Sequence, residues 1–334
     1  MELIDITLIW VAIIAVGILM YILLDGFDLG VGILFPFAPG EAARDDMMNS
    51  VAPVWDGNET WLVLGGAGLL AAFPLVYAIY LPALYIGVFL MLAGLIFRGV
   101  AFEFRFKAGP DTRPLWNIAF AAGSAVAGFA QGVVVGAYIE GFEVQGLTYL
   151  GGPFDLLTPF TLFCGLALVA GYALLGATWL ILKTEDETQE WAYRITPPLL
   201  GVVLAALVVI SLWTPIHESR VFARWLDGWH LLWPLPLLGA LSALLLYRSV
   251  RRRLEGYPFI ATLGIFVSAY AGLLASKWPY MVPPDITFRQ AASAPESQLF
   301  LLLGVLFILP VILGYTAWTY WIFRGKVKPG AGYH

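Results

Sequence analysis

The chain has 334 residues, of which 60% are hydrophobic and only 12% are charged, and its mean hydropathy is +0.83. Because a soluble domain carries about a quarter charged residues, this composition excludes an ordinary water-soluble protein and indicates an integral membrane protein. The net charge of −5 is mild and lacks the basic signature of a nucleic-acid-binding protein. The one cysteine, Cys164, lies in an apolar run, cannot form an internal disulfide, and is expected to be a buried thiol.

Nine apolar segments follow one another along the chain, each close to the ~20 residues that cross a bilayer as a helix. None alternates like a barrel strand, so we expect an all-α membrane protein. The first segment is too long for a signal peptide and no basic region precedes it, so we interpret it as a span. The predicted spans are Ile6–Phe37, Pro53–Phe73, Leu75–Phe97, Leu115–Ile139, Thr158–Leu182, Pro197–Pro215, Trp229–Tyr247, Pro258–Lys277 and Leu299–Phe323.

The basic residues predict the orientation, because cytoplasmic loops of membrane proteins are enriched in Lys and Arg. With nine spans and a periplasmic N-terminus, 14 of the 18 basic residues fall on the cytoplasmic side. The exceptions are Arg220, Arg224, Lys277 and Arg289. We therefore expect a periplasmic N-terminus and a cytoplasmic C-terminus, with Lys328 on the cytoplasmic side.

A weak internal repeat suggests how the helices are grouped. The sequence GFDL at 26–29 in the first span resembles GYAL at 171–174 in the fifth, and 96–100 resembles 246–250. This predicts a single membrane domain, 1–334, built from two parallel four-helix bundles, 1–139 and 158–277, and a ninth helix, 299–323. Chance similarity between apolar helices is the alternative. Since Ala173 replaces Asp28 in the second copy, polar chemistry is expected in the first half.

Glycines at four-residue spacing predict faces where helix backbones approach closely. Gly26 and Gly30 form such a pair in the first span, and Gly128, Gly132 and Gly136 form a double one in the fourth. We favour packing within the chain over a dedicated subunit interface.

Carboxylates inside the apolar spans are the main functional signal, because ionisable groups are costly in a bilayer and mark functional sites. The predicted orientation brings the polar groups of the first three spans to the cytoplasmic side. These candidate site residues are Asp25, Asp28, Asp56, Asn58, Glu59 and Arg98.

The spacing of the acids supports a shared site. Asp25 and Asp28 are three residues apart, as are Asp56 and Glu59, so each pair shares a helix face. Neighbouring carboxylates repel, so one needs a proton or a cation, and Arg98 is the natural cation. The cluster predicts a proton route, with Asp25 favoured over Asp28 as the carrier. The alternative is a structural lock in which Arg98 joins three helices.

Histidines and tryptophans add weaker signals. The histidines are His217, His230 and His334, and we expect none to pair with another at membrane depth, as haem held by two histidines requires. The sequence also shows no Cys/His metal spacing, so no metal site is predicted. Trp55 and Trp61 flank the Asp56 cluster, and packing is the expected role of both.

Five stretches resemble one family, subunit II of the cytochrome bd-type quinol oxidases. They are LLDGFDLGVG, SVAPVWDGNETWL, LIFRGVAFEFR, GYALLGATWLILKTE and LLLGVLFILPVILGYTAWTYWIF. The similarity covers essentially the full length, and the short loops resemble the cyanide-insensitive branch.

The resemblance implies a nine-helix accessory subunit in the bacterial cytoplasmic (inner) membrane. Its partner, subunit I, binds haems b558, b595 and d, and the electrogenic complex oxidises quinol and reduces O2 to water. Subunit II supports the haem arrangement, contributes a cytoplasmic proton route, and in some members holds a structural quinone. A small single-helix subunit is a further candidate partner. Asp25, Asp56 and Arg98 match the family's route, and Trp61 matches a tryptophan near its haem or O2 path.

Two other functions fit the residues by themselves. A proton-coupled secondary transporter would use paired acids and a repeat, but no broken helix at the midplane recurs in both halves. A purely structural assembly subunit would need no proton role at all.

Overall fold

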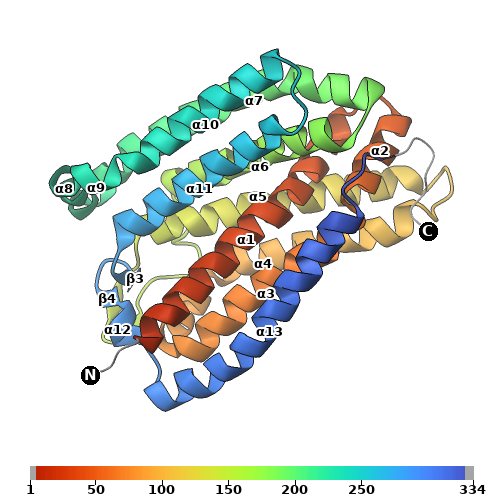
Figure 1. The fold of residues 1–334 in the computed structure, drawn as a ribbon. Coiled ribbons are helices and arrows are strands. Elements are labelled where there is room, and N and C mark those ends of the chain that lie inside the picture. The colour runs from red at the N-terminus through yellow and green to blue at the C-terminus, as the bar shows by residue number, and fades with distance from the viewer. Residues whose placement is uncertain (1–4, 328–334) are drawn as a thin grey trace.

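The computed structural model describes residues 5–327, so Lys328 and His334 lie outside the described residues. The described chain is almost entirely helical (Figure 1). Within it, nine helices have 18 or more residues, and they correspond one to one with the predicted spans. They are α1 (Ile6–Leu34), α3 (Trp55–Ala72), α4 (Pro74–Arg105), α5 (Arg113–Glu140), α6 (Pro159–Lys183), α7 (Asp186–His217), α10 (Pro234–Arg251), α11 (Tyr257–Lys277) and α13 (Pro295–Ile322).

Eight of these helices are long and apolar enough to cross a membrane among the described residues, and α3 is the exception. Its first turns carry Asp56, Asn58 and Glu59, which lower its hydropathy, although its remaining residues are apolar. An all-helical integral membrane protein is therefore confirmed. The ninth crossing and the orientation of the termini stay predictions.

Two helices extend well beyond their predicted spans. α4 continues to Arg105, and α7 begins at Asp186 and passes through Pro197 and Pro198. The predicted spans end at charges and prolines, which mark the end of the apolar stretch but not the end of the helix. A proline removes one backbone donor and can be accommodated inside a long, well-packed helix.

Short elements connect the long helices. At one end lie η1 (Phe35–Phe37) and α2 (Glu41–Val51). At the other lie α8 (Ser219–Asp227), α9 (Trp229–Leu232), the strand pairs β1 (Val144–Gln145) with β2 (Thr148–Tyr149) and β3 (Tyr280–Val282) with β4 (Ile286–Thr287), and α12 (Phe288–Ala291). Both strand pairs are antiparallel two-stranded hairpins in loops.

Helix α6 lies against α1 and α5 on one side and against α7 and α11 on the other (Figure 1). The predicted glycine faces make these contacts. A side-chain carbon on Gly30 would come within 2.7 Å of the Gly176 backbone nitrogen, and one on Gly136 would come equally close to Thr161 Cα. The glycines therefore serve packing within the chain, and they join its two halves. The division into two bundles stays a prediction.

A buried arginine fastens α2 to the ends of α4 and α5. Arg105 is fully buried, and its guanidinium donates to Asp45 Oδ1 and Asn117 Oδ1, each at 2.6 Å. Arg113 donates to the same Asp45 oxygen at 2.5 Å. Because each donor faces a charged or polar acceptor, the charge is compensated where α2 covers this end of the helices.

The α1–α6 crossing should be the most sensitive backbone contact. Changing Gly30→Ala places a methyl group against the α6 backbone, which neither helix can avoid without separating. Overpacking of this kind costs about 1–3 kcal/mol or more. We expect a lower apparent melting temperature of the purified, detergent-solubilised protein.

Gly201→Ala is the matched control, because a side-chain carbon there meets nothing within 4 Å. It should leave the melting temperature unchanged or slightly raised through better helix propensity. Equal melting temperatures for the two variants would contradict a tight crossing at Gly30.

Candidate functional site

Three helices bring charged groups together inside the protein. Arg98 of α4 lies with one guanidinium nitrogen, Nη1, 2.7 Å from Asp25 Oδ1 of α1, and its Nη2 forms an ion pair with Glu59 of α3. The side chains of Arg98 and Asp25 are fully buried, whereas that of Glu59 is 27% exposed. The cluster therefore reaches from the interior of the chain to its surface.

The second carboxylate of α1 has a different partner. Asn58 of α3 donates through Nδ2 to Asp28 Oδ2 at 2.7 Å, and more distantly to the carbonyl oxygen of Leu24 at 3.4 Å. On its other side, Asn58 Oδ1 accepts from the Tyr320 hydroxyl of α13 at 2.9 Å. Asp28 Oδ1 is buried and has no hydrogen-bond partner among the described residues.

The local sequence explains why this part of α1 can carry two acids. Every residue from Asp25 to Gly32 is buried, so neither carboxylate faces the outside of the chain. The position of Arg98 follows from the crossing of α4 with α5, where a side-chain carbon on Gly94 would come within 2.6 Å of the Gly123 carbonyl oxygen. Close backbone contacts on both helices thus hold the ion pair away from lipid.

Asp56 stands apart from this cluster. It lies in the first turn of α3 and is exposed, and no ion pair involving it occurs within residues 5–327. Its predicted face-mate Glu59 instead turns inward to Arg98. The structure therefore brings together Asp25, Asp28, Asn58, Glu59 and Arg98, and leaves Asp56 on the outer surface near their end of the protein.

A second set of hydrogen-bonded polar side chains lies beside the cluster and is not predicted from the sequence. Tyr21 lies one helical turn before Asp25, and its hydroxyl accepts from Gln131 Nε2 of α5 at 2.7 Å. Gln131 Oε1 accepts in turn from the Tyr172 hydroxyl of α6, also at 2.7 Å. All three side chains are buried. A glutamine inside an apolar span and a tyrosine four residues before an acid are the signals that could have identified them.

The two tryptophans differ. Trp55 stacks on Phe102, with ring centroids 4.9 Å apart, which agrees with the predicted packing role. Trp61 is buried, and its indole Nε1 has no hydrogen-bond partner among the described residues. A role for Trp61 near a haem or an O2 path stays a prediction.

Both described histidines contact side chains of this chain. His217, at the end of α7, lies 3.7 Å from Glu140 and packs on Phe160, while His230 of α9 contacts Trp229. Within residues 5–327 no group of three or more His, Cys, Asp or Glu side chains could hold a metal ion.

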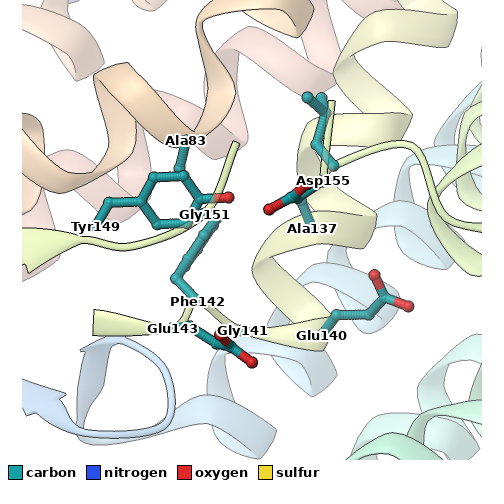
Figure 2. A pocket seen from close by; sticks show the side chains of 10 residues that line it. Ala83, Ala137, Glu140, Gly141, Phe142, Glu143, Tyr149, Gly151 and Asp155 are labelled. Atoms are coloured by element: carbon teal, nitrogen blue, oxygen red, sulfur yellow. The ribbon is translucent and has the colours of Figure 1, made fainter. Parts of the chain in front are cut away.

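A pocket of about 230 Å³ lies at the opposite end of the helices, near the β1–β2 hairpin (Figure 2). Two of its three carboxylates have local partners: Glu140 accepts from the Thr158 hydroxyl, and Asp155 from the Gly152 N–H at 2.6 Å. Burial and the nearby Asp155 raise the pKa of Tyr149, so this phenol stays neutral. The pocket is separate from the buried cluster.

The cluster holds more acidic groups than basic ones. The Arg98 guanidinium pairs with the carboxyl groups of Asp25 and Glu59, and Asp28 lies buried one turn along α1, so ionisation of all three acids would leave an unfavourable buried net charge. Sharing protons among the carboxyl groups keeps the net charge low. The same ion pairs also join α1, α3 and α4 mechanically.

The chain is similar to known proteins over almost its whole length. It is 30% identical over 360 residues to cytochrome bd-I ubiquinol oxidase subunit 2 of Escherichia coli (strain K12), with 96% of this chain and 94% of that protein covered. It is 27% identical over 330 residues to cytochrome bd ubiquinol oxidase subunit 2 of Bacillus subtilis (strain 168), with 96% of each covered.

A solved structure shares the fold. The chain superposes on a chain of the bd oxidase from Geobacillus thermodenitrificans with a TM-score of 0.80 and 17% identity, covering 96% of this chain and 99% of that one. The family model described as cytochrome bd terminal oxidase subunit II matches residues 6–323. The chain therefore belongs to the cytochrome bd terminal oxidase subunit II family, a subunit of a respiratory oxidoreductase complex and a multi-pass protein of the bacterial inner membrane.

Proposed function

We propose that this chain is the subunit of a quinol:O2 oxidoreductase that conducts protons from the cytoplasm toward an O2-reducing site in a partner, subunit I. The partner carries haems b558, b595 and d and performs the redox chemistry. Uptake of protons from the cytoplasmic side makes the reaction electrogenic. This chain contributes the proton route and supports the haem-bearing subunit.

The observation that carries the proposal is the Asp25–Arg98 ion pair with no exposed surface on either side chain. Removing two charges from water costs several kcal/mol per ion, and well-packed apolar residues often serve stability as well or better. Proton exchange therefore explains better than stability alone why three carboxyl groups lie near a single arginine.

The partial exposure of Glu59 gives the route a direction. Glu59 and Asp25 occupy opposite ends of the same guanidinium, so protons received at the surface can pass to the interior as the ion pairs rearrange. Asp28 is connected separately, through the hydrogen bond that it accepts from Asn58. Exposed Asp56 lies beside this connection and is a candidate for contact with the partner subunit or the cytoplasm.

A structural lock is the second candidate function, because Arg98 joins helices α1, α3 and α4. In that case the acids would keep the subunit competent to hold its partner without moving protons. Membership in an oxidase subunit family leaves the transporter alternative without a supporting observation.

We also propose three features that the family resemblance implies. These are a bound structural quinone, a small single-helix subunit, and a position of Trp61 near the haems or the O2 path.

Replacing Asp25→Asn should separate the two candidate functions. The amide keeps the shape of the side chain but cannot carry a proton. We expect quinol-driven O2 consumption by the purified complex to fall by about 100-fold, the scale of losing one acid–base group, with the haem absorbance unchanged.

Asp111→Asn, in an exposed turn remote from the cluster, is the control and should retain normal turnover. Normal turnover of Asp25→Asn with intact haem would remove the proton role. Loss of haem from the Asp25 variant would support the lock instead.

The nine-span orientation places the turn at Asp111 in the cytoplasm and the β1–β2 hairpin in the periplasm. Single cysteines introduced as Asp111→Cys and Leu147→Cys, in a Cys164→Ala background, test this. We expect a membrane-impermeant maleimide to label only the Leu147→Cys protein in intact cells whose outer membrane is permeable to the reagent, because Leu147 is 68% exposed at the hairpin tip.

Permeabilised cells should label both proteins. If α3 does not cross the membrane while the N-terminus is periplasmic, the two positions exchange sides and the pattern in intact cells reverses.

A further inference from the structure

A narrow cleft opens next to the Asn58–Tyr320 pair, between the start of α3 and the end of α13. It is lined by Pro53, Val54, Gly57, Asn58, Tyr315, Thr316, Thr319 and Tyr320. Its volume is about 10 Å³, close to the minimum that one water molecule requires. In Figure 1 the C-terminal part of α13 runs beside α1 and α3 toward the end of the protein where α2 lies.

The polar lining of the cleft is unusual for its helix. α13 is apolar over most of its length, and little of it is buried inside the chain. Four hydroxyl-bearing side chains nevertheless lie in its last two turns on the side that meets α3: Tyr315, Thr316, Thr319 and Tyr320. Polar walls and room for one molecule are the conditions under which a water occupies a cleft.

The orientation of the Asn58 amide is fixed by its neighbours. The Leu24 carbonyl can only accept, so Nδ2 must point toward it and toward Asp28. Oδ1 then faces α13, where it accepts from Tyr320. Because a hydroxyl can donate once and accept twice, the Tyr320 oxygen can also accept from a water in the cleft. The line from cleft to carboxylate is therefore water, Tyr320, Asn58 and Asp28.

We propose that the α3–α13 cleft is the cytoplasmic entrance for protons to Asp28, with Tyr320 as the positioning residue that anchors the entering water and holds the Asn58 side chain. The inference rests on the proposed proton route and adds an entrance for its Asp28 branch. Asn58 stands between the cleft and Asp28, so its side chain must turn aside for the water to arrive. The anchored water then meets the buried Oδ1 of Asp28, which has no other hydrogen-bond partner among the described residues.

The proton balance of the step is simple. A hydronium ion in the cleft gives one proton to the Asp28 carboxylate, an O–H bond forms there, and a neutral water remains. The return of Asn58 to Tyr320 and Asp28 separates the loaded acid from the cleft. Asp25 lies one helical turn away on the same face of α1, beside Arg98.

Filling the cleft tests the entrance directly. A side-chain carbon on Gly57 would meet only Tyr315 Cε1, at 3.7 Å, so Gly57→Leu adds bulk to the cleft without a backbone clash. We expect O2 consumption by the intact complex to fall about tenfold, which corresponds to about 1.4 kcal/mol of added barrier. Turnover should also fall more steeply as pH rises, since proton delivery becomes limiting, while the haem spectrum stays unchanged.

Gly314→Leu is the matched control on α13, because a side-chain carbon there meets nothing within 4 Å and Gly314 does not line the cleft. It should preserve both turnover and the pH profile. A pH profile of Gly57→Leu identical to that of the control would overturn the entrance.

Tyr320→Phe provides a second variant that keeps the ring packed beside Phe27 and Trp179. Losing the hydroxyl removes the water anchor, so we expect a similar slowing and steeper pH profile, with no additional loss in the double variant. If Gly57→Leu fails to assemble, Tyr320→Phe decides alone, and a normal profile for it overturns the proposal. Slow turnover of Asp25→Asn beside normal turnover of both cleft variants would reject the entrance and leave the proton route standing.

Discussion

The ion pair between Arg98 and Asp25 is the interaction on which the first half of the protein depends. It joins α1 to α4, extends through Glu59 to α3, and has no contact with the outer surface at the Asp25 end. A single arginine without these partners would be very unfavourable at this depth, as would the carboxylates without the arginine. The requirement that all these groups meet therefore constrains the relative positions of three helices.

Close helix packing makes that meeting possible. Gly94 and Gly123 bring the backbones of α4 and α5 into contact one turn before Arg98, and Gly30 and Gly176 do the same for α1 and α6. Bulky side chains at these crossings would push the helices apart and admit lipid or water beside the charges. The small residues thus serve the electrostatics of the site as well as the packing.

Polar side chains extend from the two acids in opposite directions. One set, Tyr21, Gln131 and Tyr172, leads from the side of Asp25 into the contact of α5 with α6, and all three of these side chains are buried. Asn58 and Tyr320 lead from Asp28 outward to the α3–α13 cleft. The inner line ends in packed interior and suits a role in holding α1 in place, whereas the outer line ends where water can reach it.

The sequence by itself determined the membrane class, the nine long helices and the gathering of acids and arginine near one end, because hydropathy and charge act locally along the chain. Only the tertiary structure decided the partners. Asp28 meets Asn58, Asp56 turns outward, and Tyr320 joins a residue 262 positions away. These pairings depend on the rotation and depth of each helix. Side-chain packing between distant segments fixes both, and no local pattern in the sequence records them.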